Sequence, residues 1–312
     1  MAHQRKFRFA IQHTHAPSGQ EWLDMARRAE DSGVDVFSLP DHLGDQFAPM
    51  PALAAAAAVT SKIRFSMFVL NNDNRHPGML AKEAATLDLI SNGRLELGVG
   101  AGWTRAEYDA LGMRFDKPSV RIARLAESVK ILRGVFTSDS FSFSGEHYSI
   151  TDLAIRPRPV QKAGIPILLG GGGKKMLTLA AQAADIVSVA ANNSQRPSMT
   201  SPLSGFALKD VAEQYAWVRE AAGGRFDDIE INARVLAVSV GPDRDAQVRK
   251  LAAELNLPAE DLQDSPFALV GTLEQIEGQL RALRDRFGVS YFTFSYRHST
   301  PLLPLIGRLA GR

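Results

Sequence analysis

The feature that most constrains this chain is a regular alternation between short apolar runs and longer amphipathic segments. Eight runs of aliphatic and aromatic residues recur along the 312 residues, at positions 7–12, 34–40, 63–70, 95–100, 165–170, 185–190, 231–240 and 291–295. Such runs predict strands, and their near-continuous apolar character is typical of a parallel sheet covered by helices. Eight strand–helix units favour a barrel over an open sheet. We therefore expect the α/β class, with a single (β/α)8 TIM barrel as one domain over residues 1–312.

The segments between the runs have the marks of helices. In the first, Ser18 is suited to cap the start of a helix and Gly33 to end it. Four apolar residues between them recur at helical spacing, namely Trp22, Met25, Ala26 and Ala29. Two insertions interrupt the alternation. Residues 141–150 alternate around Ser-Gly-Glu and predict a hairpin, and the polar segment 192–205 is interpreted as a lid, with plain disorder as the alternative.

Composition excludes several classes of protein. The formal net charge is +2 and no basic run could follow a phosphate backbone, so nucleic acid is not an expected partner. Without cysteine the chain has no disulfide, thiolate metal site or cysteine nucleophile, and we expect no bound metal. No segment approaches ~20 uncharged apolar residues, and the short apolar stretch near the N-terminus is not a signal sequence. We predict a cytoplasmic protein that is not bound to a membrane.

Residues that end barrel strands and begin the following loops face the active site of this architecture. The second run ends at Asp41 and His42, where a carboxylate can orient an imidazole for proton transfer. We therefore predict His42, Asp41 and Glu107 as catalytic residues. A packed or hydrogen-bonded loop histidine is the alternative interpretation. The residues expected to line the substrate site come from several loops: Gln12, His13, His15, Trp103, Tyr296 and Arg297.

Two glycine clusters stand at strand ends. Gly98, Gly100 and Gly102 have the spacing G-x-G-x-G, which lacks the third glycine of a dinucleotide fingerprint. We interpret them as positions where a flat ring approaches the backbone, with Trp103 following either against that ring or in ordinary packing. The fifth run ends in four consecutive glycines before a predicted helix that opens with Lys174. Exposed N–H groups there suit a phosphate, which we favour over a simple flexible turn.

Together these segments resemble the luciferase-like superfamily of flavin and deazaflavin barrels. The resemblance covers nearly the whole chain. It rests on EWLDMARRAEDSGVDVFSLPDHL, RHPGMLAKEAATLDLISNGRLELGVGAGWTRAEYDALG, RPRPVQKAGIPILLGGGG after the hairpin, and VGTLEQIEGQL. It is strongest with the actinobacterial-type subgroup that uses coenzyme F420, the 5-deazaflavin analogue of FMN.

The resemblance implies roles for individual positions. The Asp41–His42 pair would lie beside the reactive ring, and the third strand would carry a bulge near residues 67–70, often with a non-prolyl cis peptide. The cofactor-binding residues would be Asp41, Met67, Phe68, Leu70, Asn71, Gly102, Trp103, Gly170, Gly171, Gly172, Gly173, Lys174 and Ser188. Sugar-phosphate dehydrogenases of the superfamily place an acid where this chain has Trp103, which argues against sugar-phosphate oxidation.

These considerations lead to an F420-dependent oxidoreductase that transfers a hydride between C5 of the deazaflavin and a small organic substrate. One alternative is an FMN-dependent monooxygenase. Another is a metal-dependent hydrolase, because His13-Thr14-His15 mimics a paired-histidine metal motif, although the remaining ligands are missing. A cofactor-binding barrel without turnover is a third. The resemblance also suggests a homodimer, and a flavin or F420 reductase as the supplier of reduced cofactor.

Overall fold

The computed structural model describes residues 5–191 and 205–312. The chain divides into two compact units. Unit 1 contains residues 5–12, 32–35 and the described part of 170–312, and unit 2 contains residues 13–31 and 36–169. The strand order is that of a closed eight-stranded (β/α)8 barrel, which confirms the predicted fold class. The single-domain assignment stays a prediction, and the predicted lid, apart from Gly205, lies outside the described residues.

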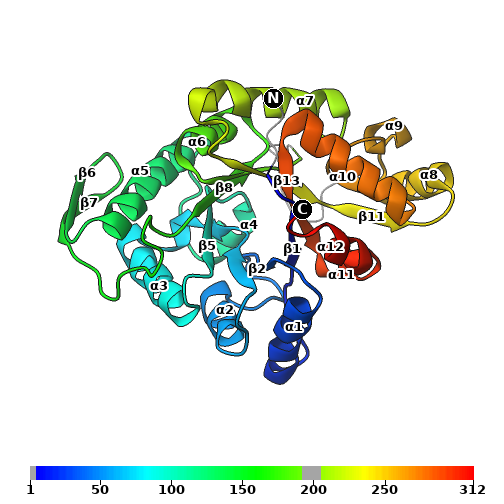
Figure 1. The fold of residues 1–312 in the computed structure, drawn as a ribbon. Coiled ribbons are helices and arrows are strands. Elements are labelled where there is room, and N and C mark those ends of the chain that lie inside the picture. The colour runs from blue at the N-terminus through cyan, green and yellow to red at the C-terminus, as the bar shows by residue number, and fades with distance from the viewer. Residues whose placement is uncertain (1–4, 192–204) are drawn as a thin grey trace. The chain divides into compact units, whose positions relative to one another are not determined.

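Unit 2 contains parallel barrel strands with helices between them (Figure 1). Its strands are β2 (Val36–Leu39), β3 (Arg64–Met67), β4 (Leu70–Asn71), β5 (Leu95–Gly100) and the first residues of β8 (Ile167–Gly171). Strand β2 pairs with β3, and β5 pairs with β3, β4 and β8. Its helices are α1 (Gly19–Asp31), α2 (Pro49–Ala57), η1 (Asn72–Asn74), α3 (Pro77–Ile90), α4 (Arg105–Ala110) and α5 (Pro118–Thr137).

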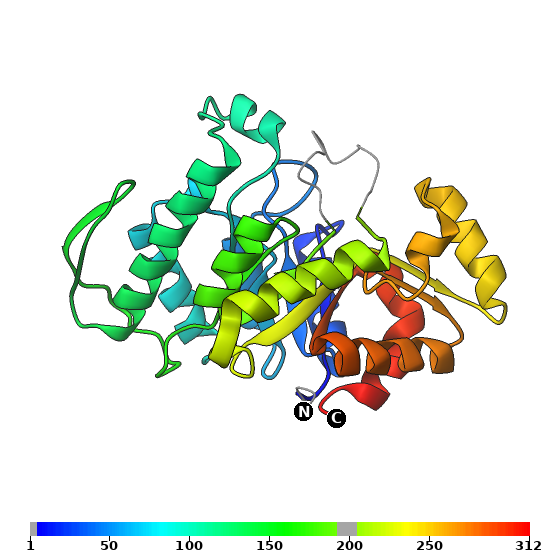
Figure 2. The ribbon, with the colours of Figure 1, turned by 90° about the horizontal axis from the view of Figure 1, so that it is seen from above.

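The predicted helix cap and hairpin in unit 2 are both confirmed. Ser18 Oγ accepts the N–H of Glu21 at 3.1 Å, and the buried face of α1 consists of the four apolar residues expected. Strands β6 (Phe141–Ser144) and β7 (Ser149–Leu153) form an antiparallel hairpin that lies beside α5 (Figure 2). The Glu127 carboxylate on α5 accepts the N–H groups of Glu146, His147 and Tyr148 at 2.8–3.1 Å. This contact fixes the hairpin turn to the helix.

Unit 1 contains the remaining barrel strands. They are β1 (Arg8–Gln12), β9 (Ile186–Val189), β10 (Glu230–Val235) and β13 (Val289–Ser295), and β10 and β13 pair in parallel with each other and with β9 and β1 respectively. The helices are α6 (Lys174–Ala183), α7 (Leu208–Ala222), η2 (Gly223–Arg225), α8 (Arg244–Leu255), α9 (Ala259–Leu262), α10 (Leu273–Phe287), α11 (Tyr296–Ser299), η3 (Thr300–Leu302) and α12 (Leu303–Leu309).

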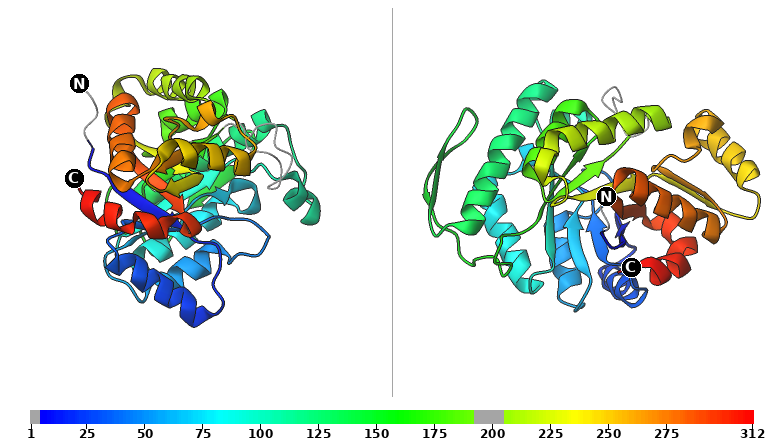
Figure 3. Two further views of the ribbon diagram at one scale, coloured as in Figure 1. Left: turned by 90° about the vertical axis from the view of Figure 1, so that its right-hand side faces the viewer. Right: turned by 45° about the horizontal axis from the view of Figure 1, so that its top comes forward.

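The predicted seventh strand is wrong as a single element. Residues 231–240 divide into β10 and β11 (Ala237–Val240), and β11 pairs with β12 (Ala268–Gly271), a strand that the sequence did not predict, in a separate small sheet. Helix α8 packs on this sheet (Figure 3, right). The N–H groups of Leu236 and Ala237 both donate to the Phe267 carbonyl, at 2.8 and 3.1 Å. A contact with a distant segment, which no local pattern reveals, therefore ends the barrel strand.

The third strand carries the predicted bulge. Ser66 pairs with Glu96 and Leu70 pairs with Val99, so the segment from Ser66 to Leu70 is one residue longer than the part of β5 that it faces. The Phe68–Val69 peptide in this segment is cis. The glycines of β5 explain how the bulge fits. A Cβ on Gly98 would overlap the Met67 carbonyl oxygen.

Gly100 and Gly102 are likewise too close to other parts of the chain to carry a side chain. A Cβ on Gly100 would lie 2.6 Å from Val69 Cγ2, and one on Gly102, at φ +71°, would overlap the Tyr108 hydroxyl. The interpretation of these glycines as positions where a flat ring approaches the backbone stays a prediction, but close contacts within the chain already account for the absence of side chains there. The groups that approach them closely belong to the chain itself.

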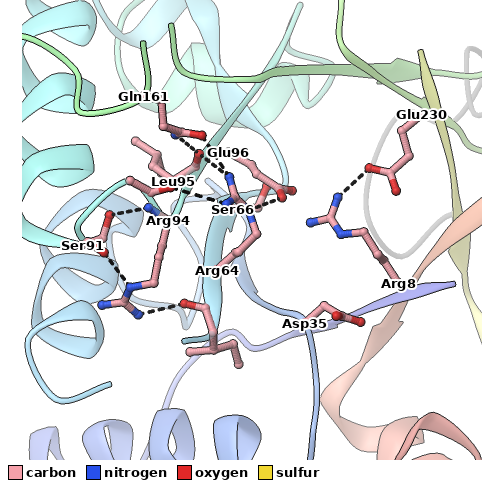
Figure 4. Close-up of polar contacts among 12 residues, drawn as sticks. Arg8, Asp35, Arg64, Ser66, Ser91, Arg94, Leu95, Glu96, Gln161 and Glu230 are labelled. Atoms are coloured by element: carbon pink, nitrogen blue, oxygen red, sulfur yellow. Dashed lines mark hydrogen bonds and ion pairs between the residues drawn. The ribbon is translucent and has the colours of Figure 1, made fainter. Parts of the chain in front are cut away.

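Ion pairs secure the amino-terminal ends of the strands in each unit (Figure 4). In unit 2, Arg64 on β3 donates to the buried carboxylate of Glu96 at 2.7 Å. Arg94, just before β5, donates to the carbonyls of Ser91, Ile63, Ala57 and Thr60 at 2.6–3.0 Å. In unit 1, Arg8 pairs with Glu230. Because active sites of barrels lie at the other end of the strands, we assign these contacts to stability.

The helices give no sign of a membrane span. Within residues 5–191 and 205–312, none combines the length and the apolar character that a bilayer crossing requires. The cytoplasmic location stays a prediction.

Candidate active site

In unit 2, a histidine and a carboxylate from different strand ends come together. His42 follows β2, and Glu107 lies in the first turn of α4, which follows β5. His42 Nδ1 lies 2.7 Å from Glu107 Oε1, and the two side chains are 19% and 17% exposed. The Trp103 ring, which is 36% exposed, contacts the imidazole edge-on with ring centroids 5.8 Å apart. The pair is shielded from bulk water yet accessible, which suits proton transfer.

The structure corrects the predicted role of Asp41. Its carboxylate does not orient His42 but accepts two hydrogen bonds from the Arg75 guanidinium, at 2.6 and 3.3 Å, and one from the Asn71 N–H at 3.0 Å. Asp41 and His42 therefore have different partners although they are adjacent in the chain. Asp41 thus secures the turn after β4, and Glu107 is the carboxylate that holds the imidazole.

A buried network positions the helix that carries Glu107. The hydroxyl of Tyr108 lies 3.1 Å from Asn71 Oδ1 and 3.0 Å from Asp73 Oδ2, and Arg124 of α5 donates to the same Asp73 oxygen at 2.7 Å. Burial, assisted by the Asp73 charge, raises the pKa of Tyr108, which therefore stays protonated. The hydrogen bonds of Asp73 thus connect α4 to η1 and α5. Asp73, Arg124 and Arg75 were missed in the sequence, because their separation along the chain from the residues they contact leaves no local signal.

In unit 1, the glycine segment has the features of an anion-binding loop. Gly170 and Gly171 end β8 and pack tightly, since a Cβ would lie 2.7 Å from Ser188 Cβ in the first case and 2.8 Å from Met176 Cγ in the second. The Gly171 and Gly172 carbonyls accept from Ala190 N and from Gln214 Nε2. Among the described residues, no main-chain oxygen accepts the N–H of Gly172 or Gly173. These two donors precede α6 and its exposed Lys174.

The other predicted site residues of unit 1 differ in burial, because some are buried and others are exposed. Ser188 is buried and donates to Asn232 Oδ1 at 2.8 Å, and Asn232 donates to Thr293 Oγ1 at 2.9 Å. Gln12 is buried, whereas Tyr296 is 45% exposed and Arg297 is exposed at the start of α11. Met67, Phe68 and Leu70 of unit 2 are buried apolar side chains of the bulge region.

One arginine on β10 was missed. Arg234 alternates with Ile231, Ala233 and Val235, and burial lowers its pKa to about 10. It stands two residues beyond Asn232 on the same strand, opposite Thr293 of β13. The signal was present, since a charged residue in the middle of an apolar strand run is rarely placed there by packing alone.

The paired-histidine interpretation of residues 13–15 is not supported. His13 is 2% exposed and its ring stacks on Phe37 with centroids 4.2 Å apart, whereas His15 is exposed and lies 3.2 Å from Thr14 Oγ1. His13 is thus a core residue, and the two rings do not converge on one metal position.

The buried His13 predicts a pH-dependent stability. Burial, and secondarily the charge of Arg28, lowers its pKa from an ordinary 6.5 to about 3. Below pH 6.5 the unfolded chain binds a proton that the folded chain does not bind, so stability should fall as the pH drops towards 3, with this residue contributing up to about 1.4 kcal/mol per pH unit. Urea unfolding at several pH values should show a shallower dependence for His13→Phe. The exposed His15→Gln control should keep the wild-type slope, and identical slopes for all three proteins would contradict the assignment.

Comparison with known proteins agrees with this geometry. A family model described as luciferase-like monooxygenase matches residues 5–286. The chain belongs to this family. Among solved structures, this luciferase-like chain is similar to the coenzyme F420-dependent tetrahydromethanopterin reductase of Methanopyrus kandleri, with a TM-score of 0.76, 20% identity, and coverage of 98% of this chain and 99% of that one. That likeness shows a shared fold.

Two curated relatives have different cofactors in their names. The chain is 32% identical over 233 residues to the F420-dependent glucose-6-phosphate dehydrogenase of Nakamurella multipartita, covering 72% of this chain and 65% of that protein. It is 27% identical over 208 residues to the FMNH2-dependent dimethylsulfone monooxygenase of Pseudomonas putida, covering 66% of this chain and 52% of that protein. The luciferase-like chain thus spans less than two thirds of the length of these relatives.

Proposed function

We propose that this luciferase-like protein is an F420-dependent oxidoreductase that acts on a small organic substrate. The observation that carries the proposal is the hydrogen bond of 2.7 Å between His42 Nδ1 and Glu107 Oε1 at the carboxyl ends of β2 and β5. A carboxylate accepts the Nδ1 proton, so the neutral imidazole presents the lone pair of Nε2. This is the arrangement of a base that removes a hydroxyl proton when a substrate carbon is oxidised, or returns it in the reverse direction.

The cofactor would contribute what the chain lacks. A bound deazaflavin supplies hydride-transfer chemistry at C5, and the protein supplies binding, orientation and electrostatics. In unit 2, His42 would hold or release the proton at Nε2, Glu107 would fix its tautomer, and the partly exposed Trp103 would limit access of water to the imidazole. Alcohols lose, and carbonyl compounds gain, a hydride together with a proton, so we propose these two classes as the substrates to test.

The glycine loop of unit 1 fits the phosphate of such a cofactor. The N–H groups of Gly172 and Gly173 are donors without a main-chain acceptor among the described residues, and Lys174 adds a positive charge at the start of a ten-residue helix. Donors and dipole together favour a phosphate. Tight packing at Gly170 and Gly171 keeps the main chain of the loop in place.

A second candidate is an FMN-dependent monooxygenase. The similarity to the dimethylsulfone monooxygenase favours it, and the same glycine loop would suit the FMN phosphate. A reductase would then have to supply reduced flavin. We expect a homodimer for either function, which sedimentation of the purified protein would test.

Titration with each cofactor tests the choice. We expect F420 fluorescence to be quenched saturably by the purified protein, and FMN to bind more weakly. The Lys174→Gln variant should weaken F420 binding, whereas Lys175→Gln, its exposed neighbour, should have a smaller effect. Tight FMN binding without F420 binding would contradict the first proposal and favour the second.

A further inference from the structure

Unit 2 contains a cleft that is distinct from the His42–Glu107 pair. Its volume is about 420 Å³, which lies in the range of small-molecule sites. Neither His42 nor Glu107 lines it. The lining residues come from η1, the residue that caps α3, the loop between α4 and α5, α5 itself and the hairpin: Asp73, Asn74, Arg75, His76, Met113, Arg114, Asp116, Arg124 and Tyr148.

Both carboxylates in the cleft are already neutralised. Asp73 accepts from Arg124 at 2.7 Å, and Asp116 accepts from Arg124 at 2.5 Å and forms an ion pair with Arg114, with Nε 2.7 Å from Oδ1. Three arginines line the cleft against these two aspartates. A cation would therefore find its ligands occupied and would face additional positive charge.

Several donors in the cleft are left for a ligand. The Nε of Arg114 lies 2.7 Å from the Asp116 carboxylate, and the Arg114 side chain is 89% exposed, so its Nη groups are accessible to a ligand. His76 Nδ1 accepts the Gly78 N–H at 3.2 Å, so the neutral ring carries its proton on Nε2. The Tyr148 oxygen accepts from Asn72 Nδ2 at 3.1 Å, which leaves the hydroxyl proton as a donor. The Glu127 contacts to the hairpin turn hold Tyr148 in place.

We propose that this cleft binds the anionic group, carboxylate or phosphate, of a small molecule. A guanidinium, an imidazole N–H and a phenol are donors that suit an anion with several acceptor oxygens. Arg75 lines the same cleft and holds Asp41, the residue before His42, by two hydrogen bonds. The cleft is thus connected through one side chain to the loop that carries the candidate base. This inference does not depend on the proposed cofactor.

Isothermal titration of the full-length protein tests it, with inorganic phosphate, a phosphomonoester such as glycerol 3-phosphate, and succinate as separate probes. At least one probe should bind, and Arg114→Gln should weaken that binding at least about tenfold, with Tyr148→Phe having a smaller effect. The control Arg105→Gln removes an exposed arginine of α4 that pairs with Asp109 and does not line the cleft, and it should bind like the wild type. The three probes distinguish free phosphate, a phosphate ester and a carboxylate as the source of the anion.

The glycine loop requires its own control, because phosphate could bind there. The Lys174→Gln variant should retain the anion binding at the cleft that is weakened in Arg114→Gln. The proposal is overturned if no probe binds, if Arg114→Gln binds like the wild type, or if only Lys174→Gln reduces binding. Because Arg114 is exposed, its variant should fold normally, and unchanged thermal unfolding of the ligand-free protein checks this.

Discussion

The His42→Ala variant should bind F420 like the wild type and lose about 10²–10⁴-fold in turnover, which is the usual contribution of a positioned acid–base residue. The side chain is 19% exposed and stands at a loop, so its removal leaves no large core cavity. Activity is followed as the change in F420 absorbance with a fixed panel of small alcohols and carbonyl compounds. The compound that reacts fastest with the wild type is then used for every variant.

Glu107→Gln provides the second arm of this experiment. It keeps the shape of the side chain but removes the charge that stabilises a protonated imidazole, so turnover should fall with little change in cofactor binding. The exposed Glu213→Gln of α7 is the matched control and should retain full activity. A His42→Ala variant with wild-type turnover would refute the role of this residue, and a loss of F420 binding in it would assign His42 to cofactor binding instead.

The largest stability effect is expected for Gly98→Ala. The new Cβ would overlap the main-chain oxygen of Met67, and a backbone atom held in a buried sheet cannot move aside as a flexible side chain can. We expect a loss of about 3 kcal/mol or more in the free energy of unfolding, at the upper end for overpacked cores. The midpoint of urea unfolding measures it, and the soluble fraction serves if the variant does not fold.

A matched glycine provides the control for this change. Gly278 lies within α10, and a Cβ there would meet nothing within 4 Å. Gly278→Ala should therefore stabilise the protein by roughly 0.5–1 kcal/mol, the usual gain in helix propensity. A Gly98→Ala variant within 1 kcal/mol of the wild type would show that the bulge of the third strand can move away from β5.

Much of the fold was predictable because the signals are local. The buried face of α1, its Ser18 cap and the hairpin at 141–150 follow from residues within one or two turns of each other. The bulge at residues 67–70 was expected only through resemblance to a family, and the close contact of Gly98 and Gly100 with it was not predicted. In the structure, they accommodate a neighbouring strand that is about 30 residues earlier in the chain.

The chain by itself determined which residues follow the strands and were therefore candidates for a site, because the alternation of strands and helices places the residues after each strand at one end of the fold. His42 and Glu107 were both candidates on that ground. Only the tertiary structure decided that they form the pair and that Asp41 belongs to Arg75. The partners are 65 and 34 residues apart, and their contact depends on how β2, β4 and β5 lie in one sheet. The periodicity of a sequence predicts on which face of a helix or strand a side chain lies. Which residue it contacts there depends on the packing of elements that are distant in the sequence.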